Sequence, residues 1–160
     1  MNRELLKKEI LTALMTALYV VLSLLVNIPI INKIRLELGY VVLGVCASFM
    51  NCWQLMFIGG VGCLLRCLFS AAQFPLGWLP SQLILCYFLS KINKFSKLWQ
   101  KIAAVVVLDL LTIGLLKTIL ECLMFQLPFW AKMGSNLVAC LSDGIGLIIG
   151  VIISDRVIRK

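Results

Sequence analysis

Long apolar stretches alternate with short polar segments along almost the whole chain. Several of these stretches approach the ~20 residues that an α-helix needs to cross the hydrocarbon core of a bilayer. The run over residues 38–70 is too long for one crossing and is interrupted at 51–54, which favours a tight helical hairpin. The pattern predicts helices at about residues 10–26, 38–50, 54–70, 78–90, 102–125 and 133–154.

Composition places these helices in a membrane. Hydrophobic residues make up 62% of the chain, charged residues only 14%, and the mean hydropathy is +1.05. A soluble domain usually carries about 25% charged residues. The chain is therefore predicted to be an all-α integral membrane bundle of six transmembrane helices. Residues 1–160 are predicted to form a single transmembrane domain, with no soluble one.

The net charge of +8 reflects membrane topology in this interpretation and does not indicate nucleic-acid binding. Most of the lysines and arginines flank the apolar runs. Ten fall on one predicted face: Arg3, Lys7, Lys8, Lys91, Lys94, Lys97, Lys101, Arg156, Arg159 and Lys160. The opposite loops hold three: Lys33, Arg35 and Lys132. Because cytoplasmic loops carry the excess of positive charge, both termini are predicted to be cytoplasmic.

Little in the chain indicates catalysis or metal binding. There is no histidine, and none of the seven cysteines forms a CxxC pair. The cysteines are interpreted as small hydrophobic residues in a reduced setting. No GxSxG, HExxH or GxxxxGK[ST] motif is present, so no enzyme activity, cofactor or metal is expected.

Five charged residues fall inside the predicted helices, where each costs at least ~2.5–3.5 kcal/mol unless it is paired or faces a cavity. They are Arg66, Asp109, Lys117, Glu121 and Asp143. The predicted topology puts Arg66, Lys117 and Glu121 in the outer halves of their helices. They are expected to line a polar pocket open to the outside, with Arg35 on the loop above. The alternative is that Lys117 and Glu121 neutralise each other, while Arg66 reaches the headgroups.

The last predicted helix carries a polar, small-residue stripe at helical spacing. It consists of Asn136, Cys140, Asp143, Gly146 and Gly150. Gly146 and Gly150 form a GxxxG pair, which allows close approach of two helices. The stripe favours a packing seam inside the bundle.

Short motifs over most of the chain carry a resemblance to a known family. Ala13 and Ala17 form an AxxxA pair in the first helix, and Ile28-Pro29-Ile30 and Ile34-Arg35-Leu36 follow in the first loop. Phe74-Pro75-Leu76-Gly77-Trp78 opens the fourth helix. With six helices in about 160 residues, this pattern resembles the substrate-binding S component of an energy-coupling-factor (ECF) transporter, closest to the folate-type branch.

The resemblance implies a specific function in the bacterial plasma membrane. Such a subunit captures a vitamin or related small molecule, here possibly folate-like, from the outside. It delivers the ligand inward with a transmembrane T subunit and two ABC-type ATPases. The T subunit would dock on Ala13 and Ala17. The candidate pocket residues are Arg35, Arg66, Trp78, Lys117, Glu121 and Trp130. The cations would attract an anionic ligand, and the tryptophans would stack on a flat ring.

Two other interpretations remain open. The chain could be a structural membrane scaffold of cell-envelope synthesis, which shares the size and hydropathy but needs no polar pocket. A small intramembrane enzyme is the second, although Asp109 and Asp143 stand in no recognisable catalytic motif. The outer-half charges favour the transport interpretation over both.

Overall fold

The computed structural model describes residues 3–25, 27–31, 34–69 and 75–158. Helices dominate the described chain, as expected. The elements in order are α1 (Arg3–Leu25), β1 (Asn27–Ile31), β2 (Ile34–Glu37), α2 (Gly39–Cys46), α3 (Cys52–Phe69), α4 (Pro75–Leu89), the 3₁₀ turn η1 (Ile92–Lys94), α5 (Leu98–Asp109), the π-helical segment η2 (Leu110–Leu116), α6 (Lys117–Phe125) and α7 (Phe129–Ile158).

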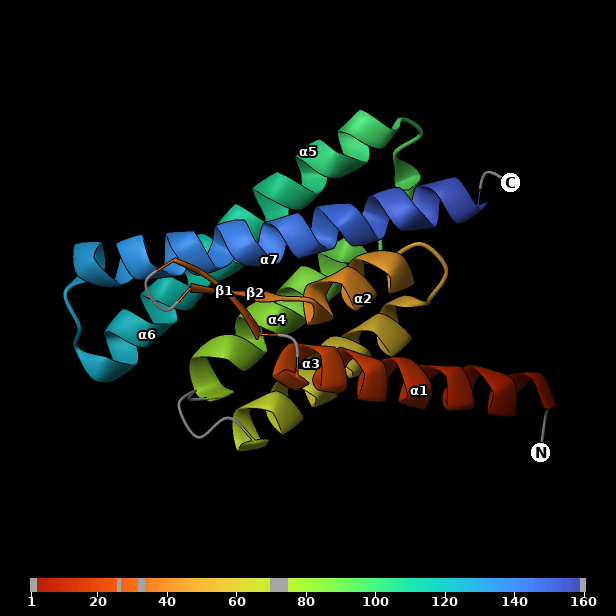
Figure 1. Ribbon diagram of the computed structural model, residues 1–160, viewed down its shortest axis with the longest axis horizontal. Helices are drawn as coiled ribbons and strands as arrows, with labels where there is room; N and C mark the ends of the chain where they lie inside the picture. The colour runs from red at the N-terminus through yellow and green to blue at the C-terminus, as the bar shows by residue number, and fades with distance from the viewer. Residues whose placement is uncertain (1–2, 26, 32–33, 70–74, 159–160) are drawn as a thin grey trace.

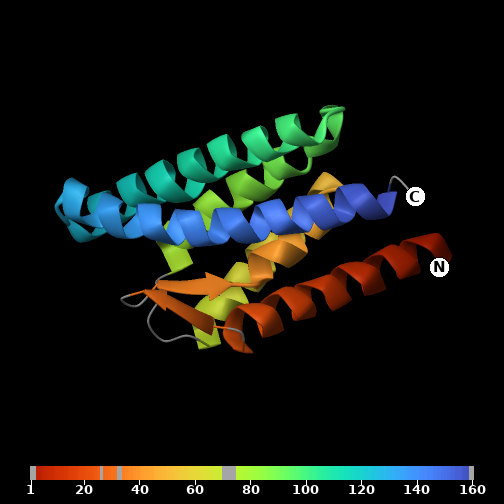
Figure 2. The same cartoon turned by 45° about the horizontal axis from the view of Figure 1, so that its top comes forward.

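Helix α7 runs through the bundle and packs against α2, β2, α5, η2 and α6 (Figure 1). Helix α2 packs against α7 along its whole length, and α1 packs against α2 and α3 on one side. Helices α4 and α5 lie on the side away from α1 (Figure 2). Both chain termini lie at one end of the molecule, and the β1–β2 hairpin and α6 lie toward the other. We call these the terminal end and the hairpin end.

The hairpin adds two strands to the expected helices. Strands β1 and β2 pair antiparallel, with Asn27 opposite Glu37 and Pro29 opposite Arg35. The segment is rich in isoleucine, whose branched side chain suits a strand. Proline cannot donate a ladder hydrogen bond or continue a helix, and an edge strand tolerates it. The polar loop expected between the first two helices is therefore ordered as a hairpin.

Several helices extend beyond the apolar limits used to predict them. Helix α1 begins at Arg3 instead of near residue 10, and α7 runs from Phe129 to Ile158. Their added turns carry charged residues, such as Glu4 and Lys7, which pair three positions apart. Apolar content marks where a helix enters lipid, whereas backbone hydrogen bonding continues into the polar interface. Helix α2 is shorter than expected and ends at Cys46.

The segment expected as one helix over residues 102–125 forms a continuous rod with a π-helical centre. Helix α5 passes into η2 at Leu110, and η2 passes into α6 at Lys117. The rod ends at Gln126, which adopts a left-handed φ of 51°, a conformation frequent just after a helix C-terminus. π-Helical turns interrupt the regular spacing of side chains and are frequent near functional sites.

Four described helices are long and apolar enough to cross a membrane: Arg3–Leu25, Cys52–Phe69, Leu98–Phe125 and Phe129–Val157. Helix α2 has 8 residues and α4 has 15, so both fall short of the roughly 17 that a full crossing needs. The four spans indicate a multi-pass membrane protein. Six crossings remain a prediction.

Glycines form the seam between α2 and α7. A Cβ atom added to Gly44 would lie 2.5 Å from the carbonyl oxygen of Leu147, and one on Gly150 would collide with the backbone at Val41. A Cβ on Gly146 would lie 3.1 Å from the Cβ of Tyr40. The backbones therefore approach more closely than side chains allow, which confirms the packing role expected of the GxxxG pair.

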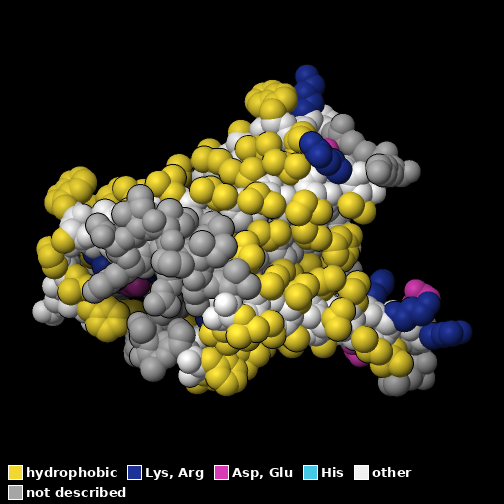
Figure 3. All heavy atoms as spheres, in the orientation of Figure 1, with side chains coloured by type: hydrophobic (Ala, Val, Ile, Leu, Met, Phe, Trp, Pro, Cys, Tyr) yellow, Lys and Arg dark blue, Asp and Glu magenta, His cyan; other side chains and the backbone are white. Residues whose placement is uncertain are grey.

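The surface has the distribution of charge that a bilayer requires. Hydrophobic side chains cover the middle of the face drawn in Figure 3, and lysines and arginines gather toward the terminal end. The exposed positions include many large apolar residues, among them Leu14, Trp53, Phe57, Leu68 and Leu123. Such an apolar surface is stable only against lipid or another protein.

Candidate functional site

A buried ion pair joins the hairpin to α3. A guanidinium nitrogen of Arg66 donates to a carboxylate oxygen of Glu37. Only 3% of Arg66 is exposed, so its charge is compensated inside the protein and the side chain does not extend to the surface. Burial raises the pKa of the Glu37 carboxyl, and the positive charges of Arg66 and Lys117 act in the opposite direction. Arg66 and Lys117 therefore offset part of the effect of burial on this carboxyl.

Two cations lie against the ring of Trp78, which is in the first turns of α4. The guanidinium carbon of Arg66 lies 4.9 Å from the ring centroid, and the ammonium nitrogen of Lys117 lies 3.4 Å from it. These separations fall within the range of cation–π attraction. Lys117 is the first residue of α6, directly after the π-helical segment, and is 3% exposed. The contacts bring α3, α4 and α6 together around one aromatic ring.

A second group of polar contacts surrounds Glu121 of α6. The ammonium of Lys132 lies 3.2 Å from one Glu121 carboxylate oxygen, and the amide of Asn136 donates to the same oxygen at 2.9 Å. Asn136 also donates to the hydroxyl of Thr118 at 2.9 Å. Gly77 stands directly over Glu121, because a Cβ there would lie 3.0 Å from the Glu121 side chain. These contacts connect α6 to α7 and to the start of α4.

Together these residues form one connected group, which we call the polar cluster. Its members are Glu37, Arg66, Trp78, Lys117, Glu121, Lys132 and Asn136. They come from β2, the last turns of α3, the first turns of α4 and α7, and α6. All of these segments lie toward the hairpin end of the molecule (Figure 1). The cluster is therefore at the end away from both termini.

The structure brings four of the predicted pocket residues into this cluster, namely Arg66, Trp78, Lys117 and Glu121. Among the described residues, Glu121 forms its ion pair with Lys132 and not with Lys117. Trp130 lies apart, because it is 81% exposed and packs edge-on against Phe129. The Arg35 side chain lies outside the described residues, although its backbone pairs within the hairpin.

Sequence reasoning missed Glu37, Lys132 and Asn136 as members of this group. Glu37 lies in the polar segment between the first two predicted helices and carries no assignment, Lys132 is counted only as a flanking charge, and Asn136 is assigned to a packing stripe. A signal was present in the charge balance. Glu37 and Glu121 are the only acids near the outer ends of the predicted helices, so buried cations there had few possible partners.

Further buried polar groups adjoin the cluster. The Tyr40 hydroxyl donates to the Gln82 side-chain oxygen at 3.1 Å, which links α2 to α4. Asp143 of α7 is fully inside the bundle, near enough to Arg66 and Lys117 to interact with their charges. Within the described chain, three polar atoms of this region have no hydrogen-bond partner: Gln82 Nε2, Asp143 Oδ2 and Glu37 Oε2. Buried polar atoms are rarely left unpaired, so these three atoms are candidates for contact with a bound ligand.

Asp109, the remaining buried charge, lies at a different place. One of its oxygens accepts a hydrogen bond from the Cys140 thiol at 3.0 Å, and Gly144 makes room for the same oxygen. This contact holds α5 to α7 just before the π-helical segment. Asp109 is therefore a helix-packing residue in this structure.

The described residues contain no group of three or more histidine, cysteine, aspartate or glutamate side chains placed to hold a metal ion. The polar cluster is instead rich in lysine and arginine, which repel metal cations. Its chemistry suits the binding of a small molecule that has acidic and hydrogen-bonding groups.

The predicted docking residues Ala13 and Ala17 lie on the exposed face of α1. The buried face of the helix carries Thr12, Thr16 and Tyr19 instead. Thr12 accepts a hydrogen bond from the Gln54 amide of α3 at 3.0 Å, which fixes this face inward. The small-residue pair is therefore free to receive another helix.

Comparison with known proteins places the fold in one class. No protein-family model matches the sequence, and no curated protein shows significant similarity to it. The chain nevertheless has the fold of an S component of an ECF transporter.

One solved structure that this chain resembles is the S component for biotin from an ECF-type ABC transporter. The two structures superpose with a TM-score of 0.71, and the match covers 100% of this chain and 95% of that chain. Sequence identity is 19%, so the likeness establishes the fold alone. The resemblance inferred from short motifs is confirmed at the level of the fold, and the likeness gives no support to the folate-type branch.

Proposed function

We propose that this chain is the substrate-capture subunit of an ECF-type ABC importer in the bacterial plasma membrane. It binds a vitamin or related small molecule from the outside and releases it inward with a T subunit and two ABC-type ATPases. In this proposal residues 1–160 form one domain of six crossings, with α2 and α4 as short helices and both termini cytoplasmic.

The observation that carries the proposal is the polar cluster at the end of the bundle away from the termini. Lysines and arginines concentrate at the terminal end, so the positive-inside rule puts the cluster in the outer half of the membrane. Buried charges inside a membrane protein usually line a substrate path or site. A structural scaffold would have no use for two buried cations against a tryptophan ring.

The composition of the cluster favours a ligand that joins a flat ring to a carboxylate. Arg66 and Lys117 supply positive charge at the Trp78 ring, and the unpaired atoms of Gln82 and Asp143 supply a donor and an acceptor. Folate and biotin both combine a ring with a carboxylate, so both are suitable probes. Arg35 and Trp130 complete the proposed pocket if the hairpin and the start of α7 fold over the ligand.

The coupling step is proposed to use the exposed face of α1. Ala13 and Ala17 allow the backbone of a T-subunit helix to approach closely, as small residues do at membrane helix interfaces. This face does not include any member of the polar cluster. Ligand capture and assembly should therefore be separable by substitution.

The direct test is native mass spectrometry of the protein purified gently from its source membrane. The expected result is a co-purified ring-containing acid, with a T subunit and ATPases in the larger assemblies. A ligand-free chain bound to cell-wall or division proteins would instead identify a membrane scaffold.

The site itself is tested by measuring affinity for the recovered compound, and for folate and biotin, by isothermal titration. Replacing Trp78 with Phe should weaken binding roughly twofold to tenfold, because ring contacts of this kind are worth about 0.5–1.5 kcal/mol. The matched control is Trp53→Phe, since Trp53 is 81% exposed on α3. Equal affinity in both variants would show that the pocket is elsewhere.

A further inference from the structure

A groove of about 890 Å³ lies between α4 and the α5–η2 rod, apart from the polar cluster. Its walls are large apolar side chains that remain exposed, such as Phe88, Val107 and Leu111. Two small side chains, Ala103 and Ala104, stand between these bulky neighbours and help to create the hollow. The groove follows the rod from about residue 99 to residue 119, roughly 30 Å of helix at 1.5 Å per residue.

One end of this groove differs chemically from the rest. Lys91, Lys94, Trp99 and Gln100 line it there, whereas the remaining wall is almost entirely apolar. The ammonium of Lys91 bonds to the Tyr87 hydroxyl at 2.7 Å. Within the described ranges, neither lysine forms an ion pair with an acidic side chain. Their positive charge is therefore available to a ligand.

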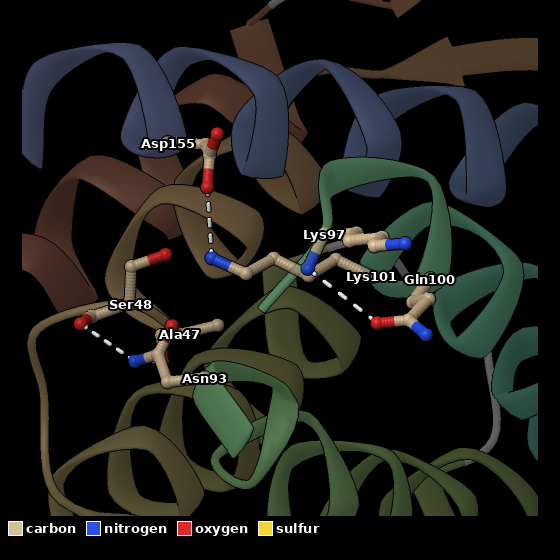
Figure 4. A network of polar contacts seen from close by, with 7 residues as sticks. All are labelled: Ala47, Ser48, Asn93, Lys97, Gln100, Lys101 and Asp155. Carbon is tan, nitrogen blue, oxygen red and sulfur yellow. Dashed lines mark hydrogen bonds and ion pairs between the residues drawn. The ribbon is translucent and has the colours of Figure 1, made fainter. Parts of the chain in front are cut away.

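The linker that carries these lysines is held firmly in place (Figure 4). The amide of Asn93 donates to the carbonyl oxygen of Ser48 at 2.7 Å, and the Lys101 ammonium lies 2.8 Å from an Asp155 oxygen. The first contact attaches the linker to the turn after α2, and the second attaches the start of α5 to α7. Lys101 already has a carboxylate partner, so it is distinguished from Lys91 and Lys94, which face the groove.

Helices α4 and α5, whose residues line the groove, lie on the side of the molecule away from α1 (Figure 2). A helix that docks on Ala13 and Ala17 would leave it uncovered. The groove is apolar along the depth of the membrane and basic with a tryptophan at its terminal end. Tryptophan is enriched at the level of the lipid headgroups, so this end lies at the membrane interface.

We propose that the groove is a specific site for an anionic phospholipid, a function beyond ligand capture. The phosphate of the lipid binds between Lys91 and Lys94, and an acyl chain lies along the apolar wall formed by α4 and the rod. Basic pockets between transmembrane helices on the cytoplasmic side bind acidic headgroups in this way. The two halves of the groove match the two halves of such a lipid in charge and polarity.

The experiment uses the full chain in nanodiscs of phosphatidylcholine that contain a minority of phosphatidylglycerol with the same acyl chains. Lipids retained on release are counted by native mass spectrometry. The wild-type chain should retain phosphatidylglycerol in excess over its share of the bilayer. The double variant Lys91→Gln/Lys94→Gln should lower that enrichment by roughly tenfold, because each lysine near an acidic surface contributes several-fold. Lys94→Gln alone should give a smaller loss.

The matched control for charge is Lys7→Gln/Lys8→Gln, which removes two exposed lysines from the same end but not from the groove. Filling the groove with Ala104→Phe should reduce all retained lipid, whereas Ala131→Phe, at an exposed position outside it, should not. An unchanged enrichment in the Lys91/Lys94 variant, or an equal loss in the Lys7/Lys8 control, overturns the proposal. If Ala104→Phe left lipid retention intact but abolished a dimer of the chain, the proposal would also be overturned. The groove would then be an interface between two copies of the chain.

Discussion

The two ends of the molecule carry charge in opposite ways. At the hairpin end, Arg66 and Lys117 are each 3% exposed and are held against Glu37 and Trp78. At the terminal end most charges are exposed, and the pair of Lys7 with Glu4 lies on the surface. Exposed lysines orient a membrane protein at little cost, whereas buried ones require partners. The comparison therefore separates residues that set topology from residues that form a site.

The largest expected effect follows from removing the partner of a buried charge. Glu37→Ala leaves the Arg66 guanidinium uncompensated inside the bundle, and loss of one member of a buried pair costs about 3–5 kcal/mol. Thermal unfolding in detergent, followed by tryptophan fluorescence, should show a large drop in midpoint temperature. The control at the terminal end is Glu4→Ala, which should change stability by less than about 1 kcal/mol because its pair is exposed. Similar shifts in the two variants would show that the buried pair at the hairpin end contributes no more to stability than the exposed pair at the terminal end.

A second comparison uses two asparagines at opposite ends. Asn136 is buried and donates to Glu121 and Thr118, so Asn136→Ala should cost about 1–3 kcal/mol by leaving those groups unpaired. Asn93 is exposed, and its shorter hydrogen bond, to the backbone carbonyl of Ser48, is also exposed. Asn93→Ala should therefore cost less than about 1 kcal/mol.

The same unfolding assay measures both asparagine variants. A larger loss for Asn93→Ala would show that the linker contacts in Figure 4 stabilise the bundle more than the contacts of the polar cluster do. In addition, Asn136→Ala should weaken ligand affinity, because Glu121 loses one of its two polar partners from α7. Asn93→Ala should leave ligand affinity unchanged.

Sequence reasoning located the helices and the buried charges but not the contacts among them. Apolar runs and small-residue spacing act over one or two helical turns, so the position of Arg66 and the GxxxG pair could be predicted. The pairing of Arg66 with Glu37 joins residues 29 apart, and that of Asn136 with Glu121 joins residues 15 apart. Such contacts depend on how helices pack, which the local pattern does not specify.

The hairpin and the π-helical segment illustrate the same limit. Isoleucines around Pro29 were compatible with a loop or with paired strands, and only the partner strand decides between them. Residues 110–116 are as apolar as any regular helix, so their composition does not indicate a π-helix. The contact between Asp109 and Cys140 lies directly before that segment, where no sequence motif marks it.

The smallest expected effect on stability is at the exposed face of α1. A bulky substitution there should nevertheless abolish assembly with the T subunit. Ala13→Trp places a large side chain at an exposed position. The free energy of unfolding should therefore change by less than about 0.5 kcal/mol. Ligand affinity should be unchanged, since α1 contributes no member of the polar cluster. The T subunit should no longer co-purify, because the bulky ring prevents close approach of its helix.

Ala131→Trp, at an exposed position on α7, is the matched control and should assemble normally. Normal assembly and uptake by Ala13→Trp would show that the coupling partner uses another face. Loss of ligand binding would show that α1 and the polar cluster do not act separately.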